Sequence, residues 1–192
     1  MGATVLADIG ASVNRRFRPT DAFVDESIRG QRYLLGCVLA EARSLGPMRL
    51  ELNGLTEARR RIHFHNESTK RRREILLAIV EMPVSAVVFV AKAEQGVRER
   101  DARAACMSDL VHMLQAEAVQ RLVIESRQDD RADVAVIVRT RTRESKLVFE
   151  HRRPIDDPML WIADAVTWAV GAGREWRDLI EPVFNDIRNV TP

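Results

Sequence analysis

The sequence predicts an α/β fold with one mixed sheet of about five strands and with helices on both faces. Apolar, β-branched segments recur singly between segments with helical patterning, which is typical of parallel strands joined by right-handed crossovers. The first two strand candidates instead follow each other across a short turn, which predicts an antiparallel hairpin. The chain of 192 residues can bury one full core but is too short for two ordinary domains.

The chain is expected to begin with a weakly ordered leader over residues 1–19, followed by a single domain over residues 20–192. The hairpin opens this domain, with strands over 21–27 and 31–40 and with Gly30 as the turn residue. Further extended segments are expected at 62–65, 85–92, 121–126 and 146–151.

Helices are expected at 40–45, 66–81, 99–120, 128–143 and 158–170, and a final helix follows the glycine break at 171–173. The first should end at Gly46-Pro47, because proline interrupts helical hydrogen bonding. Either Asn66 or Ser68 can cap the second helix. The fourth is ambiguous, since two aspartates favour a helix start whereas the VAVIV that follows favours a strand; we adopt the helix.

The composition argues against a membrane protein. No run approaches the roughly eighteen apolar residues that span a bilayer, and the N-terminus lacks a signal-peptide pattern, so we expect no membrane partner and a cytoplasmic location. Cys37 and Cys106 are expected to be buried free thiols in a reducing compartment. The net charge is only +2, but residues 49–74 contain eight basic against four acidic side chains. Such a stretch either attracts a polyanion or forms a solvated, salt-bridged helix face.

Two of the predicted strands end in acidic residues. AFVDES ends in Asp25-Glu26, and RLVIES ends in Glu125-Ser126. In an open α/β sheet, ligands bind beyond the carboxyl ends of parallel strands, so neighbouring strands would bring Asp25 and Glu125 close together. Glu26 faces the opposite side of its strand and is expected to be structural.

Asp164 is the third acidic candidate. It is the only charged residue between Asp157 and Arg174, and helical spacing places it on one face with Trp161 and Trp168. These tryptophans are expected to belong to the core rather than to stack on bases. An ionised carboxylate in apolar surroundings must be compensated by hydrogen bonds, a basic partner, a raised pKa or a metal ion.

Three carboxylates from two strand ends and a late helix suit Mg²⁺ or Mn²⁺, because hard cations prefer oxygen ligands. Such ions promote phosphodiester hydrolysis, so the hypothesis is a metal-dependent nuclease with nucleic acid as its partner. Two of these residues also have a structural interpretation: Asp25 can be a turn residue, and Asp164 can pair with an arginine. It is the combination of the three that favours a functional site.

Three segments of the chain, FVDES, IHFHNESTKRRREIL and LWIADAVTWAVGAG, resemble a widespread bacterial group of uncharacterised proteins with a ribonuclease H-like fold, related to the retroviral-integrase-like nucleases. The resemblance covers about residues 20–188. It implies a metal-dependent nuclease whose acidic cluster comes from the first strand, the strand after the central helix and a C-terminal helix. By position, these acids are Asp25, Glu125 and Asp164.

The sequence departs from that group at several positions. Ile28 replaces the glycine that often follows DES, and Glu125 replaces an aspartate. The fourth acid usual in ribonuclease H has no clear counterpart, although Asp129 or Asp130 could supply it. These departures motivate a competing hypothesis, a non-catalytic module that binds nucleic acid or protein on the same fold.

Two histidines lie near the middle of the chain on the segment expected to be extended. His63 and His65 would alternate with their neighbours and face one side, where they could contact phosphate or act as a general base. A zinc site is disfavoured because no third ligand has suitable spacing. The alternative is that both are ordinary structural or surface histidines.

Overall fold

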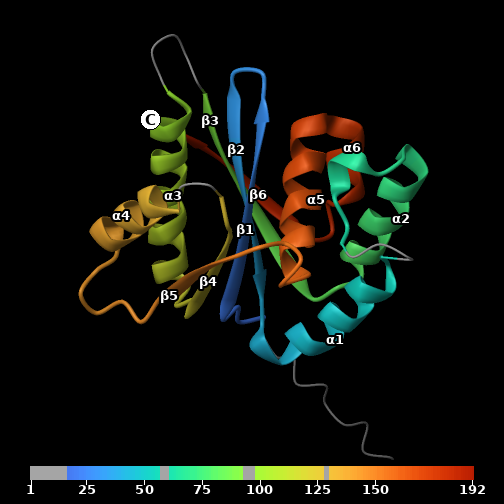
Figure 1. Cartoon of the computed structure of the whole chain (residues 1–192), viewed down its shortest axis with the longest axis horizontal. Helices are drawn as coiled ribbons and strands as arrows, with labels where there is room; N and C mark the ends of the chain where they lie inside the picture. The colour runs from blue at the N-terminus through green and yellow to red at the C-terminus, as the bar shows by residue number, and fades with distance from the viewer. Residues whose placement is uncertain (1–16, 57–60, 93–97, 128–129) are drawn as a thin grey trace, which may run out of the picture.

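The computed structural model describes residues 17–56, 61–92, 98–127 and 130–192 (Figure 1). Most of the expected leader therefore lies outside the described residues, and residues 17–20 have no regular structure. The α/β class is confirmed, with a mixed sheet of six strands rather than five. These strands are β1 (Asp21–Arg29), β2 (Arg32–Ala40), β3 (Val84–Lys92), β4 (Arg121–Glu125), β5 (Val148–Arg152) and β6 (Phe184–Val190).

The strands lie in the order β5-β4-β1-β2-β3-β6. The β1–β2–β3 segment is antiparallel, while β4 pairs parallel with β1, β5 parallel with β4, and β6 parallel with β3. Gly30 has a φ of +59° in the β1–β2 turn, a conformation that favours glycine. The predicted hairpin is therefore present.

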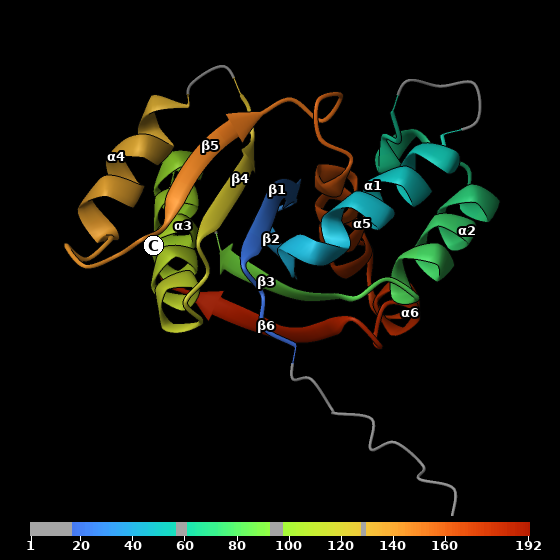
Figure 2. The ribbon, with the colours of Figure 1, turned by 90° about the horizontal axis from the view of Figure 1, so that it is seen from below.

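Helices cover both faces of the sheet (Figures 1 and 2). On one face lie α1 (Ala42–Gly54), α2 (Thr69–Val80), α5 (Met159–Ala172) and α6 (Arg174–Leu179), and on the other lie α3 (Glu99–Ala116) and α4 (Arg131–Thr140). A hydrophobic core lies on each face of the sheet. Side chains along β1 alternate between the two cores, since Phe23 packs toward α5 and Val24 packs toward α3. Ser68 caps α2 by accepting a hydrogen bond from the Arg71 N–H at 3.2 Å.

The predicted final helix is wrong over most of its length. Only α6 is helical there, and Phe184–Val190 forms the edge strand β6 beside β3. Pro182 lies between the two, where it prevents the helix from continuing. The strand is half exposed and rich in polar residues, so it lacks the apolar run by which the buried strands were identified.

Three smaller predictions also need correction. The first helix does not end at Gly46-Pro47, because α1 continues to Gly54 and buries Leu45, Met48 and Leu52; this packing outweighs the hydrogen bond that Pro47 removes. The segment 62–65 is extended only at its start, because Phe64–Asn66 forms a 3₁₀ turn. The helix α3 ends at Ala116, earlier than expected.

A close approach between the hairpin and α5 positions the candidate site. Gly36 on β2 faces α5, and a Cβ added there would lie 1.8 Å from Thr167 Oγ1 and 3.4 Å from the Ala163 carbonyl oxygen. Any larger residue would force α5 away from the sheet. Because Gly36 is the direct cross-strand partner of Asp25, this contact also brings α5 close to that carboxyl group.

The two cysteines are buried and free, as expected. Within the described ranges, no helix is long and apolar enough to span a membrane. Much of the basic stretch 49–74 makes specific contacts instead of forming a free cationic face. Arg49 binds Asp157 through two hydrogen bonds of 2.9 and 2.7 Å, and Arg72 donates to the Phe64 and His65 carbonyls at 3.0 and 2.6 Å.

Candidate functional site

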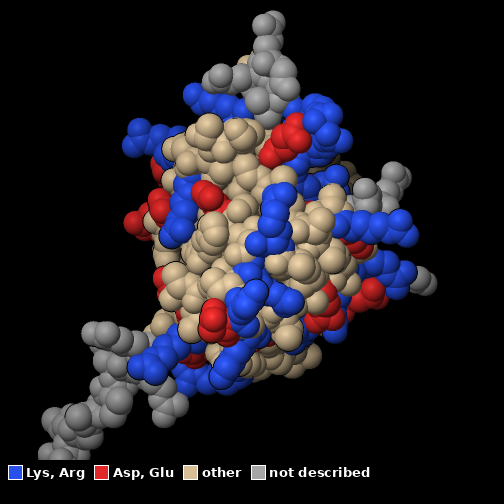
Figure 3. Space-filling model, turned by 90° about the vertical axis from the view of Figure 1, so that its left-hand side faces the viewer, with Lys and Arg blue, Asp and Glu red and all other residues tan. Residues whose placement is uncertain are grey.

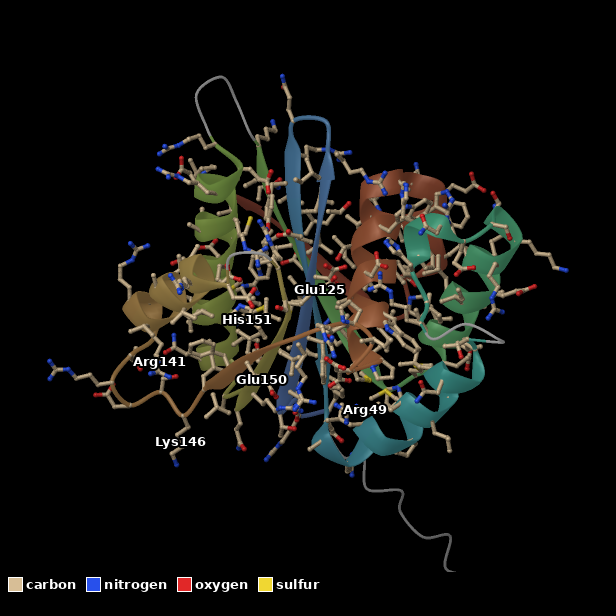
Figure 4. All side chains as sticks on the ribbon, in the orientation of Figure 1. Arg49, Glu125, Arg141, Lys146, Glu150 and His151 are labelled. Carbon is tan, nitrogen blue, oxygen red and sulfur yellow. The ribbon has the colours of Figure 1, made fainter. Side chains whose placement is uncertain are left out.

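A pocket of about 420 Å³ lies where the ends of β1 and β4 meet α5. Five of the six residues predicted as a site line it: Asp25, Glu125, Asp164, His63 and His65. In Figure 4, Glu125 lies near the centre of the molecule, where the sheet and α5 meet. The pocket therefore collects residues from the first strand, the fourth strand, the fifth helix and the segment before α2.

The parallel pairing of β1 and β4 brings Asp25 and Glu125 together. Their register ends with Val24 opposite Ile124, so Asp25 and Glu125 are the next residues on the two strands. Both side chains point to the α5 face, because Val24 and Ile124 pack into the core on the α3 face. The two carboxyl groups lie close enough for each to affect the pKa of the other, and Asp25 Oδ1 accepts a hydrogen bond from the Glu26 N–H at 2.7 Å.

Asp164 approaches the pair from α5. Its carboxylate accepts a hydrogen bond from the Phe64 N–H at 3.0 Å, and His63 Nδ1 lies 4.0 Å from the same oxygen. The side chain remains 25% exposed and faces the pocket. The Phe64 turn was missed in the sequence, although it fixes both the orientation of Asp164 and the position of His63.

The pKa values of all three carboxyl groups are raised. Burial is the largest cause for each, and the charges of Glu125 and Asp164 raise the pKa of Asp25 further. For Asp164, the Phe64 N–H and the nearby His63 oppose the increase. The direction of the shifts means that this environment disfavours three ionised carboxylates, and either protonation or a bound cation would relieve that cost.

The carboxyl oxygens of the pocket are the right type of ligand for a hard divalent cation, but they are not yet placed to coordinate one ion. Carboxylate oxygens are the ligands that Mg²⁺ and Mn²⁺ prefer. Among the described residues, no three His, Cys, Asp or Glu side chains already lie at distances that would ligate one ion. Binding would require the carboxyl groups to move relative to one another.

Asp130 does not join the cluster. Its carboxylate accepts hydrogen bonds from Ser126 Oγ and the Arg127 N–H, both at 2.8 Å, and it does not line the pocket. The proposed fourth ligand is therefore bound to the two residues that follow β4, Ser126 and Arg127. Asp129, the other candidate for that position, lies outside the described residues.

Glu26 faces away from Asp25, as strand alternation predicts. It binds Arg103 and Arg127, and it accepts a hydrogen bond from Tyr33 Oη. Arg103 also binds Asp133 through two hydrogen bonds of 2.7 and 2.6 Å, and His151 Nε2 lies 3.1 Å from Asp133. His151 belongs to the side of α3 and α4 (Figure 4). This network fixes the end of β1 against α3, α4 and β5.

Basic residues of the pocket were missed in the sequence. Arg29 and Arg61 line it along with the acids. Arg29 had a usable signal, because it lies four residues after Asp25 on one strand and therefore on the same face. Arg61 belongs to the basic stretch 49–74, but no pattern in that stretch places it beside the acids. On the face formed by α3 and α4, basic side chains are interspersed with acidic and uncharged ones (Figure 3).

Comparison of the chain with protein-family models, curated proteins and solved structures found no match.

Proposed function

We propose that this chain is a divalent-metal-dependent nuclease with a ribonuclease H-like fold, in which Asp25, Glu125 and Asp164 hold Mg²⁺ or Mn²⁺. The observation that carries the proposal is the convergence of these three carboxyl groups in one pocket, where burial and mutual repulsion raise their pKa values. The resemblance implied acids from the first strand, the strand after the central helix and a C-terminal helix. The residues lie on β1, β4 and α5, which supports that assignment.

When bound, a divalent ion supplies a Lewis acid for a phosphoryl oxygen and lowers the pKa of a coordinated water. The residues of the chain provide the rest of the chemistry. His63 lies beside Asp164 and is 47% exposed, so it can accept a proton from a water in the pocket. His65 lines the same pocket and can donate to a phosphate oxygen. The Phe64 N–H keeps Asp164 directed into the pocket.

The test is cleavage of labelled DNA, RNA and DNA–RNA hybrid in the presence of Mn²⁺. The nuclease proposal predicts that at least one of these substrates is cut and that EDTA abolishes the cutting, because removing the ion leaves the carboxyl groups without the charge they balance. Readdition of Mn²⁺ should restore cleavage, which separates metal removal from irreversible damage. Absence of cleavage of every substrate at saturating Mn²⁺ would remove the proposal.

The alternative is a non-catalytic module that binds nucleic acid or protein. It is favoured by the arrangement of the acids, because no three His, Cys, Asp or Glu side chains among the described residues already lie where they could ligate one ion. The same experiment separates the two functions when binding is measured beside cleavage. Binding of a labelled strand without any metal-dependent cutting supports the module.

A further inference from the structure

Two buried hydrogen-bond donors in the pocket wall have no acceptor in the part of the chain that the structure describes. They are the indole Nε1 of Trp168 and the Nε of Arg29. Trp168 is only 8% exposed, and both residues line the pocket that holds the carboxyl cluster. Buried donors in native proteins are nearly always paired. Two unpaired donors in one pocket wall therefore point to an acceptor that the chain itself does not provide.

Arg29 differs from Arg103 and Arg127, which also line the pocket. Arg103 and Arg127 both bind Glu26, whereas Arg29 forms no hydrogen bond or ion pair with any described residue. Its position is set by packing: a Cβ added at Gly171 would lie 3.0 Å from Arg29 Cγ and 3.2 Å from its Nε. The missing side chain at Gly171 thus leaves room for Arg29 to lie along α5. Its positive charge remains available for an anion.

The indole ring of Trp168 is already covered. The guanidinium carbons of Arg29 and Arg72 lie 5.5 and 4.3 Å from the ring centroid. Phe64 and Trp176 contact the ring edge-to-face, at centroid distances of 5.2 and 5.1 Å. A nucleobase therefore has no open face on which to stack. The group that Trp168 can offer to a ligand is its N–H.

We propose that Arg29 and Trp168 form a subsite for a backbone phosphate of nucleic acid, beside the phosphate on which the carboxyl cluster acts. Guanidinium groups bind phosphate oxygens through paired hydrogen bonds, and the indole N–H adds a neutral donor. Trp168 lies one helical turn after Asp164, and Arg29 lies on the same face of β1 as Asp25. The subsite therefore adjoins the cluster. This inference rests on the proposed function and names how its substrate is held.

The test measures binding of a fluorescein-labelled single strand of nucleic acid by fluorescence anisotropy. Ca²⁺ replaces Mn²⁺ in the buffer to limit cleavage of the strand. Arg29→Met is expected to weaken binding about tenfold and to lower the slope of log affinity against log salt by about 0.7, because one phosphate contact is lost. Trp168→Phe keeps an aromatic side chain but replaces the indole with a smaller ring that has no N–H, and it is expected to weaken binding about threefold. Thermal unfolding of each variant checks that it is folded.

Arg32→Met is the matched control. Arg32 lies directly opposite Arg29 in the hairpin and carries the same charge, but it does not line the pocket. It is expected to change affinity less than about twofold, in line with an exposed charge. Equal weakening by the two substitutions would mean general attraction by the hairpin and would overturn the subsite, as would unchanged binding by Arg29→Met or no binding by the wild type.

The outcomes for the subsite and for the nuclease differ. If cleavage depends on metal but Arg29→Met binds the strand as tightly as the wild type, the subsite proposal is overturned and the nuclease proposal is retained. Selective weakening by Arg29→Met without any cleavage supports the subsite on a binding module and removes the nuclease.

Discussion

Asp25→Asn is expected to lower Mn²⁺-dependent cleavage by about a thousandfold, equivalent to about 4 kcal/mol of lost transition-state stabilisation. An amide has nearly the shape of the carboxyl group but carries no charge, so it weakens a site built from Asp25, Glu125 and Asp164. The initial rate at saturating Mn²⁺ measures the effect. Asp156→Asn is the control, because Asp156 pairs with Arg153 outside the pocket, and its rate should equal that of the wild type.

The same variant should be more stable than the wild type when no metal is present. The pKa of Asp25 is raised in the folded protein by burial and by its two acidic neighbours. A raised pKa means that the stability contributed by the protonated form is lost as the pH rises above 3.8, the ordinary value for an aspartate. At neutral pH the free energy of unfolding of Asp25→Asn is expected to be about 1 kcal/mol larger than that of the wild type. This difference should vanish in acid.

The two measurements together distinguish a functional acid from a structural one. If Asp25→Asn cleaves slowly but is at least as stable as the wild type, the substitution has removed catalytic function and has left the fold intact. A variant that is slow and also less stable would contradict the account, because it would mean that the Asp25 carboxylate supports the structure.

Arg103→Met is expected to destabilise the protein by about 3–5 kcal/mol. Arg103 is 7% exposed, and its guanidinium binds Asp133, Glu26 and Tyr33 Oη. Burial alone would raise the pKa of Asp133, but hydrogen bonds from Arg103 and His151 outweigh burial and hold that pKa at about 2. Removing Arg103 leaves Asp133, itself 3% exposed, without its main partner. Chemical denaturation measures the loss.

The pH dependence checks the cause of that loss. In the wild type, the stability contributed by Asp133 is present above pH 3.8 and is lost as the pH falls toward 2. The deficit of Arg103→Met should therefore be largest near neutral pH and should shrink in acid, where Asp133 is protonated in both proteins. Arg100→Met on the same helix is the control, since Arg100 is 67% exposed beside Asp101 and should cost about 0.5 kcal/mol or less. Equal losses would contradict the role given to Arg103.

The buried parts of the fold could be predicted from the sequence because their patterns are local. The hairpin, β3, β4 and α5 are apolar segments bounded by turn residues, and each formed where expected. The strand β6 could not be predicted, because a polar edge strand is held by its pairing with β3 and not by its own composition. For the same reason, the continuation of α1 past Pro47 depends on contacts that no local pattern encodes.

The candidate site divides in the same way. Asp25, Glu125 and Asp164 could be selected because strand ends and an isolated charge on an apolar helix are visible in the sequence. Asp130 was also selected, but it does not line the pocket and its carboxylate accepts hydrogen bonds from Ser126 Oγ and the Arg127 N–H. The pairing of Arg103 with Asp133 and Glu26 joins residues far apart along the chain, and only the folded arrangement reveals it.

The central claim is that Asp25, Glu125 and Asp164 form one cation site, and calorimetric titration with Mn²⁺ tests it most directly. Titration in two buffers of different ionisation enthalpy also counts the protons released. We expect the wild type to bind Mn²⁺ and to release protons to the extent that the raised pKa values leave these carboxyl groups protonated, and we expect Asp164→Asn to bind much more weakly. Failure of the wild type to bind Mn²⁺, or equal binding by Asp164→Asn, would contradict the claim.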